Sequence, residues 1–390
     1  QTSRIMHNMV HVPKRTKKSF TESDSAELAD RDVFVPDPPE EDDLWFLPGP
    51  DHATLDAAHD LPLPKADQTP LVDVVAWAQA EAALARPLAD LALQVGRLTE
   101  RMQTGPEGWQ HRLALREAAD LSWLAGDRVP MERLALWLTL RLAGDNEDAQ
   151  ALARAGWAVR RLVGGVAPRD DLAGFLGRQS ENVRLDDQIA DWAEVMGQAQ
   201  GLHSISRAAL GFHIWPVVQL STGHAMGGAA PLPLMEAAVV AARSALHAKA
   251  SPGVGSHPSV GSHPIAGSHF LPLALGGAGG LRGAGTPYDR LQRWIAGADH
   301  ATRAALRSLD GVASWETAAQ TACAGLSGRT PPQLIRLLRD WPLVSAPMAE
   351  AETSASRAAI QRNLNWMTQA GIIREVTGQG RYRFWAANVG

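Results

Sequence analysis

Amide and guanidinium side chains gather near the C-terminus of the sequence, where they could recognise nucleic-acid bases. Gln361 and Asn365 lie one helical turn apart, and an amide of this type can form two hydrogen bonds with an adenine edge in the major groove. Arg357 and Arg362 flank them and can reach a guanine or a phosphate. The candidate DNA-binding residues are Ser356, Arg357, Gln361, Arg362, Asn365, Arg374, Gln379, Arg381 and Arg383.

Further arginines follow this segment. Arg381 and Arg383 alternate with Tyr382, so in a strand both would project from the same side, toward a phosphate backbone or a minor groove. Residues 331–390 contain seven Arg, no Lys and four acidic residues, whereas the whole chain has a net charge of −5. Basic charge is therefore concentrated in the last part of the chain, which favours a nucleic-acid partner.

Two short helices joined by a turn are expected to position these side chains. Ser345 can cap a helix over residues 347–352, and Ser356 can cap a second helix over residues 357–370. Gly371 supplies a C-terminal stop. One face of the second helix is apolar, because the positions i, i+4 and i+7 are Ile360, Leu364 and Met367.

A β-hairpin and a preceding helix complete the predicted domain. Residues 372–377 and 381–386 are strand-like, and the glycine-containing loop 378–380 separates them. Residues 333–341 predict the preceding helix. This order is that of a winged helix-turn-helix, a fold used either to read DNA or to bind other proteins. The arginines on the second helix and on the wing favour DNA over the protein-binding alternative.

The remainder of the chain predicts a mainly α protein. Its 390 residues are 45% hydrophobic, which is enough for two or three domains with real cores. Amphipathic segments with short glycine-containing breaks run from residue 69 to about residue 166 and indicate an antiparallel helix bundle. Further helical segments follow to residue 250. Helix positions in the bundle carry residues expected in its core, namely Trp109, Trp123, Trp137 and Trp157.

The domain boundaries follow from these patterns and from shifts in composition. The connector before the C-terminal domain is expected to contain three helices, over residues 287–297, 301–309 and 314–326. The predicted parts are a disordered charged tail (1–68), a helical body (69–250), a Gly/Ser/His/Pro-rich loop or linker (251–286), a helical connector (287–330) and the winged helix-turn-helix (331–390).

Charge is segregated within the predicted tail. Its first 21 residues hold five basic groups and no acid, and residues 37–43 hold five acidic groups. The basic arm could follow phosphates or could be solvated, and the composition favours the solvated tail. Within the predicted linker, Gly-Ser-His recurs at residues 255, 261 and 267. A surface loop explains this repeat more simply than a weak metal site does.

Neither catalytic nor cofactor chemistry is indicated. Cys323 is the single cysteine, which excludes an intramolecular disulfide and a cysteine-based zinc site. The spacings between His203, His213 and His224 match no helical metal pair, so each is expected to be a core histidine. Hydrolase and phosphate-binding motifs are missing from the sequence. The most apolar span, residues 225–242, contains prolines and a glutamate and predicts a buried helix, and a cytoplasmic location is expected.

Three stretches resemble an uncharacterised family of alphaproteobacterial proteins, often carried on plasmids of rhizobia and their relatives. They are WQHRLALREA (109–118) with LAGDR (124–128), then FLPLALGGAGGL (270–281), and finally a run from LSGRTPP (326–332) through SRAAIQRNL (356–364) to REVTGQGRYR (374–383). The resemblance covers roughly residues 75–387 and is most specific at the C-terminus. It implies a helical body with a terminal helix-turn-helix and assigns no activity. The tail and the Gly-Ser-His repeat depart from the family pattern.

These observations predict a non-enzymatic, mainly α protein whose multi-helix body delivers a C-terminal winged helix-turn-helix to double-stranded DNA. Transcriptional regulation is the expected role, with no cofactor and no metal. The body could serve self-association into a homodimer or the binding of other protein subunits. The alternative is an interaction subunit of a plasmid or chromosome segregation or recombination complex, whose winged helix binds protein.

Overall fold

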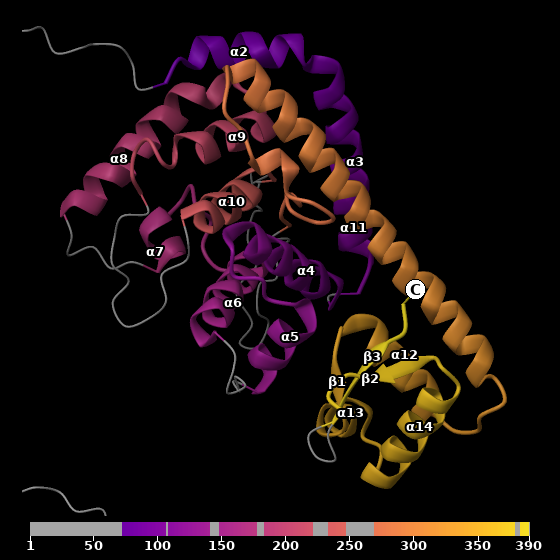
Figure 1. The fold of residues 1–390 in the computed structure, drawn as a ribbon. Helices are drawn as coiled ribbons and strands as arrows, with labels where there is room; N and C mark the ends of the chain where they lie inside the picture. The colour runs from indigo at the N-terminus through magenta and orange to yellow at the C-terminus, as the bar shows by residue number, and fades with distance from the viewer. Residues whose placement is uncertain are drawn as a thin grey trace, which may run out of the picture. The chain divides into compact units, whose positions relative to one another are not determined.

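The computed structural model describes residues 72–106, 108–140, 148–177, 183–220, 233–246, 269–378 and 383–389. The predicted tail, almost all of the Gly-Ser-His repeat, His224, Gln379 and Arg381 lie outside these ranges. The described part is mainly helical, as predicted, and a small sheet lies near the C-terminus (Figure 1). The helices of its first part are α2 (Val74–Ala83), α3 (Ala85–Thr104), α4 (Gly108–Ala125), α5 (Met131–Leu140), α6 (Ala149–Val163), α7 (Leu172–Leu176), α8 (Val183–Gln198), α9 (Ser204–Ile214), α10 (Pro233–Ser244) and α11 (Pro287–Cys323), with 3₁₀ turns η3 (Ala199–Gly201) and η4 (Gly279–Leu281).

The beginning of the amphipathic region forms two helices, α2 and α3, which are separated at Leu84. Asp73 caps α2 by accepting the N–H of Ala76, and the chain leaves helical geometry at Leu84 before α3 begins. Leu84 is buried and both helices pack along α11. The break at Leu84 therefore allows the apolar face of α2 and that of α3 each to pack against α11. The periodicity of the sequence alone does not reveal this break.

α4, α5 and α6 form the predicted antiparallel group. A bidentate ion pair fastens the loop after α4 to α6, because Nε and Nη2 of Arg154 donate to Asp127 at 2.8 and 2.6 Å. Trp109 is buried, as expected. Trp123 is not a core residue, since 57% of it is exposed on the last turns of α4. The helical period places it on the face of α4 that the body leaves uncovered.

The histidine predictions have different outcomes. His213 packs between the rings of Trp77 and Phe212, with centroids 5.9 and 5.2 Å away, and burial lowers its pKa to about 4. It is therefore a neutral, half-buried residue that packs on two aromatic residues of the core, which agrees with the prediction in part. His203 is exposed, and the prediction for it is wrong. Its ring nitrogen accepts the N–H of Ile205, so it caps α9 instead of filling a core position.

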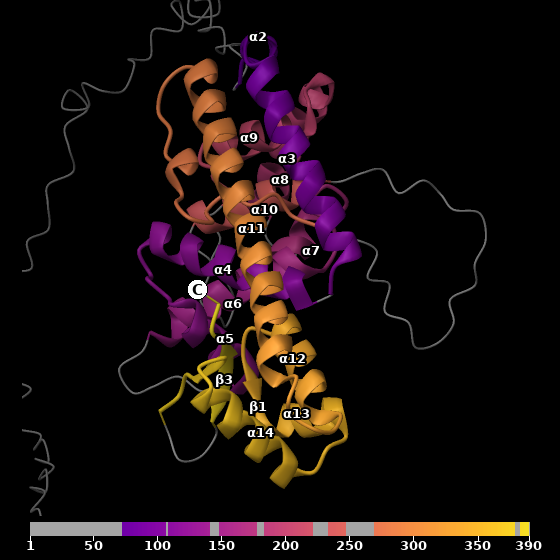
Figure 2. The same ribbon diagram turned by 90° about the vertical axis from the view of Figure 1, so that its right-hand side faces the viewer.

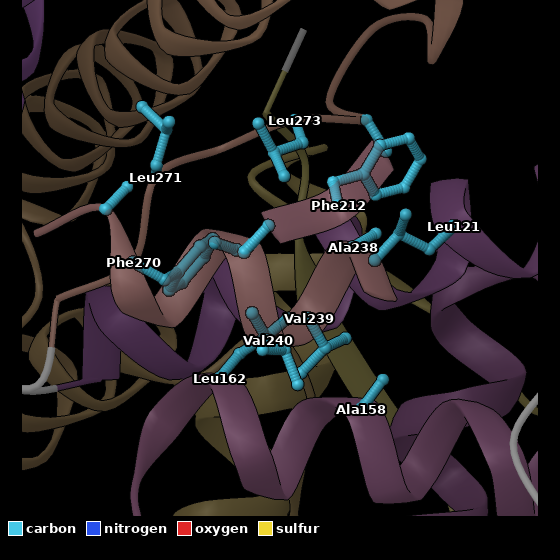
Figure 3. Close-up of a cluster of buried hydrophobic side chains, with 14 of the residues drawn as sticks. Leu121, Ala158, Leu162, Phe212, Ala238, Val239, Val240, Phe270, Leu271 and Leu273 are labelled. Carbon is cyan, nitrogen blue, oxygen red and sulfur yellow. The ribbon is translucent and has the colours of Figure 1, made fainter. Parts of the chain in front are cut away.

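α10 lies at the centre of the body. Every residue from Met235 to Arg243 is buried, which a helix achieves only when neighbours surround it on all sides. Figure 3 shows Ala238, Val239 and Val240 of this helix among side chains from α4, α6, α9 and the segment before α11. Those neighbours include Leu121, Ala158, Leu162, Phe212, Phe270 and Leu273.

Residues 269–286, the described part of the predicted loop or linker, form a loop that is packed in the core of the body. Phe270, Leu271 and Leu275 are each at most 4% exposed and belong to the main hydrophobic core. The chain passes so close to α11 that a Cβ atom added to Gly280 would lie 2.8 Å from the Cα of Gly297. The composition predicted a loop or linker here, and the structure adds that its glycines allow two backbones to touch.

The connector is one helix instead of three. α11 runs over 37 residues, or about 55 Å, from a capping box at Thr286 to Cys323. Its first part packs in the core of the body, whereas Trp315, Ala319 and Cys323 belong to a second core in the C-terminal domain. Interior glycines suggested breaks, but packing on both sides keeps the helix continuous.

The C-terminal domain has the predicted winged helix-turn-helix order, and it contains α12 (Thr330–Asp340), β1 (Val344–Ser345), α13 (Ala346–Thr353), α14 (Arg357–Gln369), β2 (Ile373–Glu375) and β3 (Phe384–Ala387). The strands form an antiparallel sheet in the order β1-β3-β2, with Val344 opposite Trp385 and Arg374 opposite Ala386. β1 did not stand out in the sequence, because a two-residue strand has no period to detect.

Candidate nucleic-acid interface

Two serines cap the helices of the helix-turn-helix. The hydroxyl of Ser345 accepts the N–H of Met348 at the start of α13, and that of Ser356 accepts the N–H of Ala359 at the start of α14. Between the helices, Ser354 adopts a left-handed conformation with φ of 52°, which ends α13 and redirects the chain. Ser356 thus has a structural role at the position where the sequence placed a DNA contact.

α14 has one buried face and one exposed face. Ile360, Leu364 and Met367 are completely buried against α12, α13 and the sheet, as the apolar period predicts. Arg362 and Asn365 are exposed and Gln361 is half-buried on the other side of the helix. Figure 2 shows α14 beside α13 in the C-terminal domain.

The two amides on α14 are hydrogen-bonded to each other. Nε2 of Gln361 donates to Oδ1 of Asn365 at 3.0 Å. This bond leaves the carbonyl oxygen of Gln361 as an acceptor and the NH₂ group of Asn365 as a donor. An adenine presents a donor and an acceptor side by side in the major groove, so the pair as ordered here offers complementary groups.

The two arginines of α14 differ in their surroundings. Arg362 is exposed and makes no ion pair with the described part of the chain. Arg357 lies 3.3 Å from Glu350 of α13, and its side chain is 69% exposed. Such an exposed pair contributes little stability, so Arg357 can exchange its carboxylate partner for a phosphate at low cost.

Arg383 directly precedes β3 and is engaged by two side chains of the sheet. Its Nη2 lies 2.7 Å from Oε2 of Glu375, and its guanidinium lies over the ring of Trp385, 5.0 Å from the centroid. Only about a third of the side chain is exposed. A neighbouring acid and an aromatic face therefore engage Arg383, and its contact with DNA stays a prediction. Arg381 and Gln379 stay predictions, because they lie outside the described residues.

Arg374 points to the body instead of to open solvent. Its Nη2 donates to Oε1 of Glu132 on α5 at 3.0 Å, and half of the side chain is exposed. Sequence reasoning could not find this partner, which lies 242 residues away along the chain. Glu132 thus engages one nitrogen of the Arg374 guanidinium, and a contact of Arg374 with DNA stays a prediction.

Contacts from α4 and α11 hold the C-terminal domain on the body. The buried Arg112 donates from Nη2 to the carbonyl oxygens of Leu338 and Arg339 at the end of α12, at 2.9 and 3.2 Å. Burial lowers the pKa of Arg112 to about 10, so the side chain stays charged at neutral pH. Nε1 of Trp315 on α11 donates to the buried carbonyl of Ile372 at 2.8 Å. These contacts involve α12 and the chain before β2, and they leave the exposed face of α14 uncovered.

Comparison with known proteins assigns the domain. Residues 331–387 match the family model described as an HTH DNA binding domain. None of the curated proteins matches the chain. The chain is therefore mainly helical and contains a helix-turn-helix DNA-binding domain over residues 331–387, in which α13 and α14 are the first and second helices of the helix-turn-helix motif.

Metal clusters and membrane-spanning helices are both missing from the described ranges. No three His, Cys, Asp or Glu side chains come together there in a way that could hold a metal ion. None of the helices in those ranges combines the length and the apolar character needed to cross a bilayer.

Proposed function

We propose that this protein binds a specific DNA sequence and acts as a non-enzymatic transcriptional regulator. The observation that carries the proposal is the exposed face of α14, where Gln361, Arg362 and Asn365 lie opposite a completely buried apolar face. A helix-turn-helix reads DNA by placing such a helix in the major groove. The family match over residues 331–387 supports the same partner.

The division of labour on α14 follows from side-chain chemistry. Gln361 and Asn365 supply the donor and acceptor that discriminate bases. Arg362 supplies charge, and Arg357 adds a second cation once it leaves Glu350. Contacts to phosphate position the domain, whereas contacts to base edges specify the sequence.

The test compares matched variants on a labelled duplex taken from upstream of the protein's own gene, after footprinting has located the bound site. Asn365→Ala is expected to weaken specific binding by about 1–3 kcal/mol, or roughly 5- to 150-fold in Kd, and to relax preference at one or two base pairs. Gln320→Ala is its control, because Gln320 is an exposed amide on α11 outside the domain core.

Arg362→Ala tests the electrostatic contribution of α14 to DNA binding. It is expected to weaken binding to all sequences alike and to lower the slope of log K against log salt by about one. Arg307→Ala serves as control, because Arg307 is an exposed arginine on α11. If Asn365→Ala and Arg362→Ala, with unchanged circular dichroism, bind the footprinted site as tightly as the parent, α14 is not the DNA contact.

That negative result would favour the alternative, in which the protein is an interaction subunit of a segregation or recombination complex. The ion pairs of Arg374 and Arg383 suit this alternative, since they show that arginines of this domain can be used in protein contacts. A protein-binding surface gives a shallow salt dependence, whereas the displacement of several counterions from DNA gives a steep one.

A further inference from the structure

A pocket lies between the end of α4 and the glycine-rich segment before α11. Its volume is about 550 Å³, within the range of small-molecule sites. Asp120 and Trp123 of α4 line one part of it, and Gly277, Gly279 and Arg282 line another. The DNA-binding role proposed above uses none of these residues.

Three chemically different side chains line this pocket. Trp123 is 57% exposed, which is unusual for so large an apolar ring, and the guanidinium of Arg128 lies over this ring, 5.9 Å from its centroid. Oδ2 of Asp120 accepts the N–H of Gly276 at 3.2 Å, and its Oδ1 makes no hydrogen bond with the described residues. Arg282 is exposed and forms no ion pair with the same part of the chain. An aromatic face, an anion and a cation therefore border one space.

Glycines keep this space open. A Cβ atom added to Gly277 or Gly279 would have no heavy atom within 4 Å. The segment that carries them is nevertheless well fixed, because Gly280 touches the backbone of Gly297 and the carbonyl of Gly276 lies 3.1 Å from Nε2 of His300. The opening is thus a rigid feature of the fold, and the absence of side chains leaves room for a flat ring.

We propose that this pocket binds a small aromatic zwitterion of the aromatic α-amino-acid type. The ring stacks on Trp123, the ammonium group bonds to Asp120, and the carboxylate pairs with Arg282. A purely cationic ligand would leave Arg282 uncompensated, and a purely anionic one would face Asp120. Burial raises the pKa of Asp120, and an ammonium partner would offset that loss of solvation.

Both walls of the pocket connect to the C-terminal domain. The helix that carries Asp120 and Trp123 also carries Arg112, whose guanidinium holds the end of α12. The glycine-rich segment is fixed to α11, which carries Trp315 to the chain before β2. An occupied pocket can thus alter how the domain is held. This effector role rests on the proposed DNA-binding function, whereas ligand binding itself does not.

Isothermal titration calorimetry of the full chain with L-phenylalanine tests the site. We expect saturable binding of one ligand per chain, with phenethylamine and 3-phenylpropanoate each at least tenfold weaker because each lacks one charged group. L-Alanine, which lacks the ring, should give no saturable heat. If L-phenylalanine, L-tyrosine and L-tryptophan all fail to bind, the proposal is overturned, and equal binding of phenethylamine overturns the zwitterion class.

Matched variants locate the binding. Trp123→Ala and Arg282→Ala are expected to weaken it at least tenfold, while Tyr288→Ala, an exposed aromatic outside the pocket, leaves it unchanged. Gly279→Leu should block the pocket without disturbing the fold, because the new side chain enters open space. Gly197→Leu on the exposed face of α8 is its control. Parent-like binding in the three pocket variants, with unchanged circular dichroism, places the ligand elsewhere and overturns the assignment.

A second arm measures DNA binding with and without L-phenylalanine. A ligand-dependent change in the Kd for the footprinted site, lost in Gly279→Leu, supports the effector role. Ligand binding that leaves the Kd for DNA unchanged overturns that role and leaves the binding site intact. If the protein binds no DNA at all, the proposed function fails, and the calorimetry still decides the pocket.

Discussion

Glu117 offers a graded test of how the segment before α11 is held in the core. The side chain is fully buried on α4, and its carboxyl group accepts three successive backbone N–H groups. Oε1 accepts from Leu273 and Ala274 at 2.8 and 2.9 Å, and Oε2 accepts from Leu275 at 3.0 Å. Replacing Glu117 by Leu removes both acceptor oxygens and with them all three hydrogen bonds. Gln keeps one oxygen for two of the donors and puts an NH₂ group, which cannot accept, opposite the third.

The expected costs follow from the number of donors left without a partner. A buried unsatisfied N–H group costs about 1–3 kcal/mol, so Glu117→Gln should cost about 1–3 kcal/mol and Glu117→Leu about 3–9 kcal/mol. The second value is comparable with the whole unfolding free energy of a typical domain, about 5–15 kcal/mol. These costs apply near pH 5, where the carboxyl group is protonated and both of its oxygens can still accept.

The pH dependence has a definite sign. Burial raises the pKa of Glu117 from 4.5 to about 7, against the opposing effect of the three N–H groups. Because the folded-state pKa is raised, the folded protein binds this proton more tightly. The stability that results is complete below about pH 4.5 and is lost as the pH rises through 7. The difference corresponds to roughly 3 kcal/mol. Glu117→Gln lacks this contribution. The difference in unfolding free energy between the parent and this variant should therefore become smaller between pH 5 and pH 8.

Urea unfolding followed by circular dichroism at pH 5 and pH 8 measures both effects. The order expected at pH 5 is parent, then Gln, then Leu. The reasoning is refuted if the unfolding free energy of Glu117→Leu lies within about 1 kcal/mol of that of the parent at pH 5, since three buried N–H groups without an acceptor should cost more than that. A Gln deficit that is the same at both pH values would show that Glu117 does not titrate as described.

Three further predictions concern the attachment of the C-terminal domain. Gly108→Ala places a methyl group against the carbonyl of Asp340 and should lower the unfolding free energy by about 1–3 kcal/mol; an unchanged urea midpoint would mean that α4 and α12 can separate freely. Trp315→Phe leaves the buried carbonyl of Ile372 without its donor, so the unfolding free energy should fall by about 1–3 kcal/mol in the same assay. An unchanged unfolding free energy would mean that another group donates to this carbonyl in place of the indole. Arg374→Ala breaks an exposed pair with Glu132 and should cost less than about 1 kcal/mol; a salt slope for DNA binding that falls by about one in this variant would show that Arg374 moves from Glu132 to a phosphate.

The sequence by itself determined the helix-turn-helix, because its signals are local. Ser345 and Ser356 cap helices by bonding N–H groups three residues away, and that bond needs no partner from elsewhere in the chain. The apolar period of α14 fixes which face is buried and, by difference, which face carries Gln361, Arg362 and Asn365. Hence the fold class and the position of these three side chains could be predicted.

Composition misled where a residue's role depends on its neighbours. The composition of residues 251–286 predicted a loop or linker apart from the body, and residues 287–326 were expected to form three separate helices. Packing reversed both expectations: Gly280 and Gly297 touch, and a 37-residue helix passes through two cores. Trp123 likewise fits a core pattern by residue type and is exposed by its angle on the helix.

Tertiary structure alone decided which arginines of the C-terminal domain are paired with acidic side chains and which are free to bind phosphate. Arg357, Arg374 and Arg383 look equivalent in the sequence, yet each is paired with an acid, and the acid that pairs with Arg374 lies on α5. An ion pair depends on two side chains meeting in space, and the separation of 242 residues between Glu132 and Arg374 carries no periodic signal. Local hydrogen bonds and the helical period depend on residues that are close in the sequence. Whether an arginine is paired depends on which acidic side chains the folded chain places beside it.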